Sequence, residues 1–137
     1  MLRHRLGKVG KQRRARGSAL AEFAVISPLL ITILLGIVEF GYLYMLRQTM
    51  TNAAREGCRL GIIDSSTEAM VLARVQEMMN ATGVTIYSVN YVKGTEEDPV
   101  DSLDITVNYA DVTLLPGFFS SYVGDITTAC SMRQEGT

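Results

Sequence analysis

The feature that most constrains this chain is a long apolar stretch close to its N-terminus. Between residues 18 and 46 the only charged side chains are Glu22 and Glu39, which bracket the run FAVISPLLITILLGIV. An α-helix rises about 1.5 Å per residue, so the segment from Ser18 to Glu39 would extend about 31 Å, close to the roughly 30 Å of a bilayer's hydrocarbon core. The sequence therefore predicts a transmembrane helix over residues 18–46, with Glu39 as a solvated charge at the far headgroup region.

The charges on either side of this stretch are strongly asymmetric. Residues 1–17 hold 7 basic side chains and no acid, whereas residues 18–137 hold 6 basic and 14 acidic side chains. Because basic residues near a span stay in the cytoplasm, we expect the N-terminus inside and the acidic remainder outside the cytoplasm. A basic arm could instead bind nucleic acid, but a basic run directly before a span is typical of a topology signal. We therefore expect no nucleic-acid partner.

Glu22 is an unusual residue for the first turns of a membrane helix. An ionised carboxylate there costs on the order of 2.5–3.5 kcal/mol on insertion scales, so it requires a partner. Cleavage after Gly17 would supply one, because the new α-amino group of Ser18 would lie at about the same depth, in the same chain or in a neighbouring one. An ordinary secretory signal peptide does not fit, since no A-x-A-like site follows the apolar stretch before Arg47.

The helical pattern continues beyond the apolar stretch. Small and apolar residues recur at helical spacing while polar residues take the other faces. The recurring residues are Leu43, Leu46, Met50, Ala53 and Gly57. We expect one helix from about Ser18 to Leu60, whose extracytoplasmic continuation over residues 47–62 is covered by a small domain formed by residues 63–137.

Two local features of this helix have structural consequences. Pro28 lacks a backbone N–H and is expected to bend the helix, which membrane helices tolerate when side chains re-satisfy the backbone. Gly57 and Gly61 form a small-xxx-small pair. This pair fits either helix dimerisation or close packing of the helix end on the domain.

The C-terminal part predicts one more helix followed by strands. The segment Ser65–Glu68 fits a capping box, which would start a helix. The apolar face of that helix is formed by Val71, Val75, Met78 and Met79. The hydrophobic period then changes to two over residues 84–92 and 103–109, and a last strand is expected over residues 125–133. The predicted fold class is α+β and pilin-like: a long N-terminal helix, one further helix and an antiparallel sheet of about three strands.

Two loops join these elements. Residues 93–99 are acidic and rich in turn formers, which is typical of an exposed hairpin loop, and they lack the pattern of an EF-hand calcium site. The apolar segment Leu114–Phe119 either packs on the core or exposes an interaction patch.

The two cysteines are Cys58, near the top of the long helix, and Cys130, in the last predicted strand. Both are expected outside the cytoplasm, where disulfides persist, so we expect them to pair. Such a bridge would close a loop of about 70 residues and contribute roughly 4 kcal/mol by chain-entropy arguments. The alternative is a pair of buried free thiols.

Enzymatic functions are disfavoured by the residue inventory. The single histidine, His4, lies in the basic N-terminal segment, so a Ser-His-Asp site or a His-ligated metal centre has no imidazole beyond that segment. There is no glycine-rich phosphate loop. Asp98, Asp101 and Asp104 lie in or beside the predicted hairpin and are interpreted as solubilising charges. We therefore expect no enzyme activity, no cofactor and no metal.

The segment RGSALAEFAVISPLLITILLGIVEFGYLYMLRQTMTNAAREGCRLG resembles the N-terminal region of TadE-like pseudopilins, minor subunits of tight-adherence (Tad, or Flp) type IV pilus systems. The resemblance implies that residues 1–17 are a leader that a prepilin peptidase removes between Gly17 and Ser18. It also implies that Glu22 pairs with the free N-terminus of an adjacent subunit, and Phe23 stands where the family carries Phe or Tyr. The two cysteines stand where relatives often have small apolar residues, so their pairing is not implied by the family.

Two functions remain open on this basis. In the first, the chain is a structural subunit of the inner membrane and the pilus, with membrane lipid, prepilin peptidase, other pilin subunits and the assembly platform as partners. In the second, it is an uncleaved, signal-anchored extracytoplasmic binding or adhesion module. Processing at Gly17 and the role of Glu22 distinguish the two.

Overall fold

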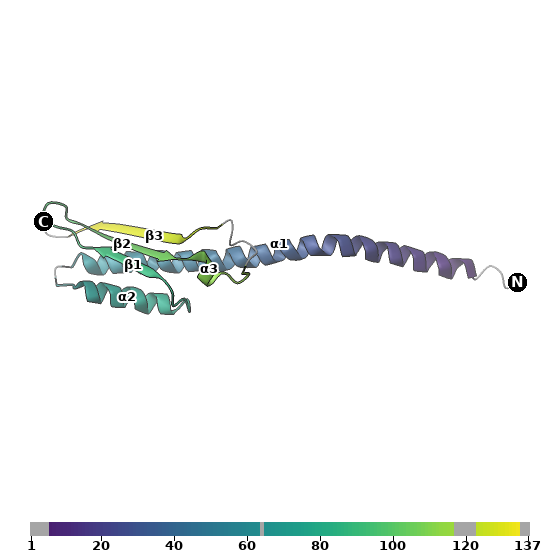
Figure 1. The fold of residues 1–137 in the computed structure, drawn as a ribbon, viewed down its shortest axis with the longest axis horizontal. Coiled ribbons are helices and arrows are strands. Elements are labelled where there is room, and N and C mark those ends of the chain that lie inside the picture. The colour runs from purple at the N-terminus through teal and green to yellow at the C-terminus, as the bar shows by residue number, and fades with distance from the viewer. Residues whose placement is uncertain (1–5, 64, 117–122, 135–137) are drawn as a thin grey trace. The chain divides into compact units, whose positions relative to one another are not determined.

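The structure, a computed structural model, describes residues 6–63, 65–116 and 123–134, with side chains described from Gly17 onward. In chain order its elements are α1 (Leu6–Gly61), α2 (Glu68–Asn80), β1 (Ser88–Val92), β2 (Val100–Val107), α3 (Tyr109–Val112) and β3 (Ile126–Arg133) (Figure 1). The chain divides into an N-terminal unit that ends at Val38 and a C-terminal domain that starts at Glu39. The predicted α+β fold class is confirmed, with α3 as an addition that the sequence did not suggest.

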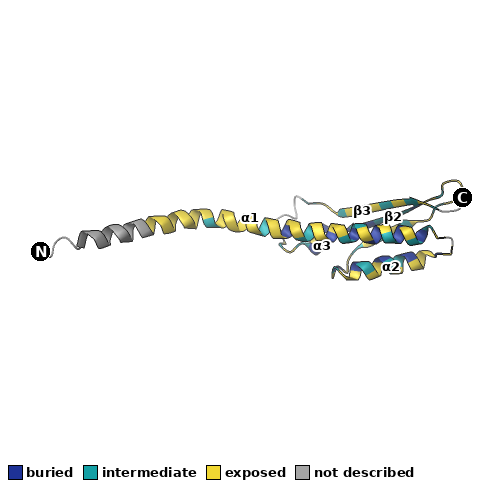
Figure 2. Ribbon diagram, turned by 180° about the vertical axis from the view of Figure 1, so that it is seen from behind, coloured by how far each residue is buried: buried dark blue, intermediate teal, exposed yellow. Residues whose placement is uncertain are grey.

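From Glu39 onward, one face of α1 forms part of the domain core. Along this half of the helix, buried and exposed residues alternate with the helical period (Figure 2). The fully buried residues are Leu46, Met50, Ala53, Ala54 and Cys58. Burial of a side chain the size of Leu or Met stabilises a fold by about 1.5–3 kcal/mol, so this stripe anchors the domain on α1. The predicted amphipathic continuation of the helix is confirmed.

The two glycines near the end of α1 allow this close packing. A Cβ atom on Gly57 would lie 2.8 Å from Cδ1 of Leu103 and 2.9 Å from Cγ2 of Val75. A Cβ atom on Gly61 would lie 2.7 Å from the Tyr91 hydroxyl oxygen. Of the two readings of this glycine pair, packing against the chain's own domain is confirmed, because that packing occupies the face on which a second helix would have to dock.

Helix α2 begins later than the capping box predicts. Its N-cap is Thr67, whose hydroxyl oxygen accepts a hydrogen bond from the backbone N–H of Met70 at 3.4 Å. The predicted N-cap, Ser65, is therefore wrong. The residue between the two, Ser66, uses its hydroxyl elsewhere. Ser66 donates to the carbonyl oxygen of Gly61 at 3.0 Å and so closes the end of α1. The apolar face of α2 is as predicted, with Val71, Val75 and Met79 buried and Met78 partly buried.

The sheet is antiparallel, in the order β1-β2-β3. Its central strand, β2, alternates between the core and the outer face, and its buried residues are Asp101, Leu103, Ile105 and Val107. Leu103 is the register partner of Tyr91 in β1 and of Cys130 in β3. The loop between β1 and β2 exposes Glu96, Glu97 and Asp98, so the predicted hairpin loop is confirmed.

Two predicted strand boundaries are wrong. The second strand was expected to reach Tyr109, but it ends at Val107 because the Asn108 side chain accepts a hydrogen bond from the backbone N–H of Ala110 at 2.8 Å and starts α3. The first strand was expected from Val84, but pairing starts at Ser88. The two corrections share a cause for residues 84–86, because their register partners would be residues 108–110, which lie beyond the end of β2.

The apolar segment expected at Leu114–Phe119 is only partly described. Leu114 is half exposed, and residues 114–116 form a bend and turn. Phe118 and Phe119 lie outside the described residues, so the choice between core packing and an interaction patch is not tested there.

Candidate functional site

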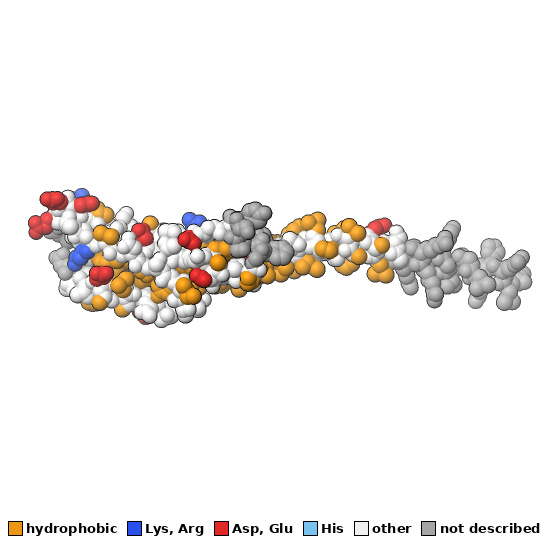
Figure 3. Space-filling view, in the orientation of Figure 1, with side chains coloured by type: hydrophobic (Ala, Val, Ile, Leu, Met, Phe, Trp, Pro, Cys, Tyr) orange, Lys and Arg blue, Asp and Glu red, His pale blue; other side chains and the backbone are white. Residues whose placement is uncertain are grey.

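The N-terminal half of α1 presents apolar side chains in all directions. Its most apolar window of 18 residues has a mean hydropathy of 2.3, and the helix is long and apolar enough to cross a membrane. Hydrophobic side chains gather along it in Figure 3. The large side chains that are more than half exposed are Leu20, Phe23, Val25, Ile26, Leu29, Leu30, Ile31, Ile33, Leu34, Ile37 and Val38. A surface of this kind is stable only against lipid or other apolar helices.

Glu22 is the one acidic residue between Gly17 and Val38. The Ser18 hydroxyl donates a hydrogen bond to Oε1 of Glu22 at 3.3 Å, one helical turn apart. A Cβ atom on Gly17 would meet nothing within 4 Å, and Phe23 is 64 % exposed. The helix thus brings Ser18 and Glu22 together and leaves Gly17 and Phe23 open. The side chains of the basic leader up to Arg16 lie outside the described part of the chain.

Pro28 illustrates how α1 remains helical in this apolar segment. Since Pro28 has no N–H, the carbonyl oxygen of Ala24 loses its usual helical donor. The Ser27 hydroxyl lies 3.5 Å from that oxygen, and the Thr32 hydroxyl donates to the carbonyl oxygen of Pro28 at 2.8 Å. Side chains of the helix itself therefore re-satisfy backbone groups around the proline, as expected from the sequence.

Glu39 is not the solvated charge that the sequence predicted. It is 1 % exposed and accepts hydrogen bonds from the Tyr109 hydroxyl at 2.9 Å, the Thr113 hydroxyl at 2.6 Å and the backbone N–H of Leu114 at 3.1 Å. Burial and the bond to Glu39 raise the pKa of the Tyr109 hydroxyl, which favours its role as donor. We call Glu39, Tyr109, Thr113 and Leu114 the Glu39 clamp, because it fastens α3 and the following loop to α1.

A sequence signal for the Glu39 clamp did exist. Glu39 precedes Leu43 by four residues and Leu46 by seven, so it lies on the same helical stripe as the buried core residues. Its partners, by contrast, have no local signal, because Tyr109 and Thr113 are distant in sequence.

Asp101 is a second buried carboxylate, and its prediction as a solubilising charge is wrong. It has no exposed surface and accepts hydrogen bonds from the Tyr91 hydroxyl at 2.7 Å, the Gly94 backbone N–H at 2.7 Å and Nε2 of Gln134 at 2.8 Å. Burial alone would raise the pKa of Asp101, but these bonds, with the nearby Lys93 charge, hold it below its ordinary value. Asp101 therefore fixes the hairpin loop and the end of β3.

The two cysteines, far apart in sequence, are neighbours in the fold. Both are thiols in the structure, with Cys58 buried and Cys130 partly exposed. Burial, followed by a hydrogen bond to the Cys130 thiol, raises the pKa of Cys58 to about 12.

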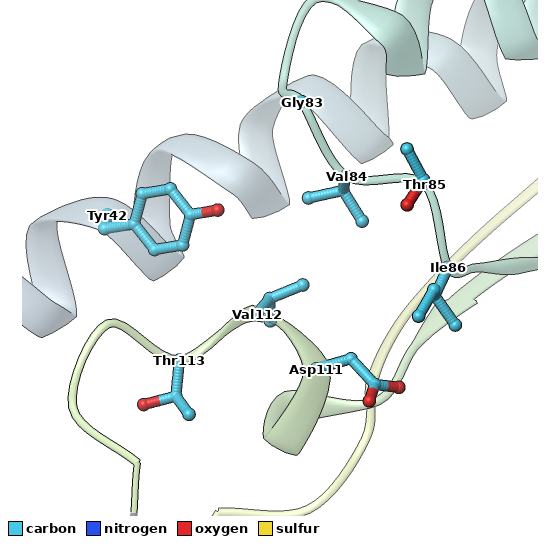
Figure 4. A pocket seen from close by; sticks show the side chains of 8 residues that line it. All are labelled: Tyr42, Gly83, Val84, Thr85, Ile86, Asp111, Val112 and Thr113. Carbon is cyan, nitrogen blue, oxygen red and sulfur yellow. The ribbon is translucent and has the colours of Figure 1, made fainter.

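The described residues of the domain line surface hollows, of which we consider one polar and one apolar. One hollow has a volume of about 160 Å³ (Figure 4). It is lined by α1, by the segment that follows α2, and by α3, which contribute Tyr42, Val84 and Asp111 respectively. The other, of about 540 Å³, is apolar and lies beside Phe40, Tyr44 and Ile126, with Arg47 at its edge. Within the described residues, no group of three or more His, Cys, Asp or Glu side chains could hold a metal ion.

A single long apolar helix that leads into a small α+β domain is a pilin-like architecture. Residues 17–59 match the family model described as TadE-like protein, which confirms the resemblance over this segment of α1. Comparison with curated proteins and with solved structures found no match. The matched segment is the part of α1 that carries Glu22, Phe23 and Cys58.

Proposed function

We propose that this protein is a minor pseudopilin, a structural and assembly subunit of a Tad-type type IV pilus. In this proposal, α1 anchors the chain in the inner membrane with its N-terminus in the cytoplasm and its domain outside. Prepilin peptidase cleaves after Gly17, and the mature helix then packs with other subunits. The alternative, an uncleaved anchored binding module, would keep residues 1–17.

One observation carries this proposal above the others. Between Gly17 and Val38, within the segment that matches the TadE-like model, the apolar surface of α1 is interrupted by a single carboxylate, Glu22, one turn after the proposed cleavage site. A charge in that position is costly in lipid and is stabilised by a positive partner. The new α-amino group of Ser18 on an adjacent subunit is such a partner, and pairing with it would set the axial register between two helices.

The partners follow from this mechanism. Prepilin peptidase, membrane lipid, other pilin or pseudopilin subunits and the inner-membrane assembly platform would each contact α1. TadE-like pilins are generally structural proteins without enzymatic activity, which agrees with the residue inventory of this chain. The domain would then serve as the part that neighbouring subunits contact outside the membrane.

Glu22→Gln tests the pairing mechanism, with Ser18→Ala as its matched control. The substitution to Gln keeps an oxygen that can accept from the Ser18 hydroxyl but removes the charge. We expect processing to proceed and the copurification of partner pilins from detergent-solubilised membranes to fall at least about tenfold, the loss that corresponds to about 1.4 kcal/mol. Ser18→Ala removes the hydroxyl but keeps the α-amino group, and should assemble normally.

Two results would contradict the mechanism. If Glu22→Gln copurifies with its partners as the wild type does, charge pairing is not required. If Ser18→Ala fails as severely as Glu22→Gln while still being processed, the hydroxyl contact within the chain matters and the amino group does not.

A further inference from the structure

Cys58 and Cys130 are brought together by packing of three elements. Cys58 lies on the buried face of α1, and Cys130 lies in β3 opposite Leu103 of β2. Cys58 belongs to the core cluster that includes Leu103, and Cys130 packs against the same cluster. This contact joins the helix to the far strand of the sheet.

The surrounding packing holds this contact in place. The residue before Cys58 is Gly57, which approaches Leu103 so closely that a Cβ atom would lie 2.8 Å from its Cδ1 atom. Leu103, in turn, is the register partner of Cys130. The helix cannot withdraw from β2 without breaking the core, so the two sulfurs stay near each other in the folded domain. A disulfide can form only between cysteines that the fold brings close together.

The two thiols differ in accessibility, and burial makes the Cys58 thiol a weak acid. Cys58 has no exposed surface, and burial holds its pKa at about 12, so its sulfur is almost entirely protonated at neutral pH. Cys130 is only partly buried. Since the thiolate is the nucleophile in disulfide exchange, and since an oxidant must reach it, Cys130 is the better entry point.

We propose that Cys58 and Cys130 form a disulfide through exchange with an external disulfide donor, with Cys130 as the entry thiol and Cys58 as the resolving thiol. The proposal goes beyond the pilin function, but the oxidising surroundings it needs rest on the proposed placement of the domain outside the cytoplasm. Its physical result is a covalent link between α1 and the sheet, which would resist pulling on the helix.

The exchange proceeds in two steps. The Cys130 thiolate attacks one sulfur of the donor, the donor's S–S bond breaks, and a mixed disulfide forms on Cys130 while one donor sulfur leaves as a thiol. The Cys58 sulfur, on losing its proton, attacks the Cys130 sulfur and releases the second donor sulfur. The protein pair loses two electrons, the donor disulfide gains them, and the two thiol protons end on the donor's two thiols.

The first experiment treats the full-length protein in detergent micelles with glutathione disulfide and follows its intact mass. The wild type should lose two hydrogen atoms and keep no glutathione. Cys58→Ala should accumulate one glutathione on Cys130, whereas Cys130→Ala should react at Cys58 at least about tenfold more slowly. Cys58→Ser and Cys130→Ser provide second variants if either alanine variant fails to fold by circular dichroism. Oxidation of the wild type should also raise its melting temperature by on the order of 10 °C.

Each outcome decides the proposal. A wild type that carries glutathione on both cysteines, or keeps two free thiols, overturns the disulfide, and equal labelling rates in the two single variants overturn the assignment of the entry thiol. A second experiment alkylates the protein from native membranes before and after reduction. A chain that begins at Ser18 but has two free thiols overturns the disulfide and leaves the pilin function standing. A chain that begins at Met1 and contains the disulfide overturns the proposed pilin function and leaves the disulfide standing.

Discussion

At the scale of single residues, two buried carboxylates organise the domain. Glu39 and Asp101 each accept three hydrogen bonds, and in each case a backbone N–H and a tyrosine hydroxyl are among the donors. Buried charges of this kind persist only where hydrogen bonds replace lost water. Each carboxylate therefore fastens a loop that no strand pairing would hold.

Substitutions in the Glu39 clamp should lower the stability of the domain by an amount that depends on how many hydrogen-bond donors lose their acceptor. Glu39→Gln places an amide NH₂ where the backbone N–H of Leu114 needs an oxygen. We expect it to destabilise the domain by about 1–3 kcal/mol. Tyr109→Phe is the matched variant and should cost less, because Thr113 and Leu114 still bond to the carboxylate. The measurement is thermal unfolding of the full chain in detergent, by circular dichroism. If Glu39→Gln melts with the wild type, the clamp does not stabilise the fold.

Because of Asp101, we expect the stability of the domain to fall in acid. Its pKa is lowered by folding, so its contribution is present above the ordinary value of 3.8 and is lost as the pH falls below that value. Asp101→Asn should melt earlier than the wild type at about pH 7, by an amount that corresponds to about 1–3 kcal/mol, and the difference should shrink as the pH falls below the ordinary value of 3.8. Melting curves of both proteins across this range test it. A difference in melting temperature that stays constant with pH would show that the ionised form is not favoured by folding.

At the scale of elements, α1 combines two environments in one helix. Its first half exposes apolar side chains, and its second half buries one stripe in the domain. At Gly57 and Gly61, near the end of the helix, a Cβ atom would come within 3.0 Å of side chains of the domain, so these two positions need glycine for the close packing.

This close approach predicts opposite effects for two glycine-to-alanine changes. Gly57→Ala would force a methyl group against Leu103 and the stiff side chain of Val75, so we expect a net destabilisation, with overpacking costing about 1–3 kcal/mol. At Gly41 a Cβ atom meets nothing within 4 Å, so Gly41→Ala should be neutral or stabilise the helix by up to about 1 kcal/mol. Thermal unfolding of both variants measures the difference. A Gly57→Ala protein as stable as Gly41→Ala would contradict the packing.

The elements that the sequence predicted well are those specified by local periodicity. The stripe from Leu46 to Met50 and Ala53, the apolar face of α2 and the hairpin between β1 and β2 follow from spacing alone. The errors occur where distant groups compete with a local signal. Thr67 caps α2 in place of the predicted Ser65, while Ser66 between them bonds back to Gly61, and Asn108 caps α3 instead of extending β2.

At the scale of the whole molecule, the candidate site also has parts that local sequence specifies and parts that depend on distant residues. Glu22, Gly17 and Ser18 are close in sequence, so their arrangement on one helix was predictable. The burial of Glu39 and Asp101 depends on partners such as Tyr109, Thr113 and Gln134, whose positions only the folded domain determines.

The chain combines an apolar helical segment that ends at Val38 with a domain that starts at Glu39 and is held together by its core stripe and the Glu39 clamp. As a processed pseudopilin, it would carry a free amino group at the start of that helix and Glu22 one turn later. The proposed function therefore requires the removal of residues 1–17.

The most direct test is the intact mass of the protein extracted from membranes of its native host. A mass that begins at Ser18 is the result we predict, and Gly17→Ala, included as a control variant, should shift it to the unprocessed chain. A wild-type mass that begins at Met1 would contradict the account, because Glu22 would then lack the amino group it is proposed to pair with.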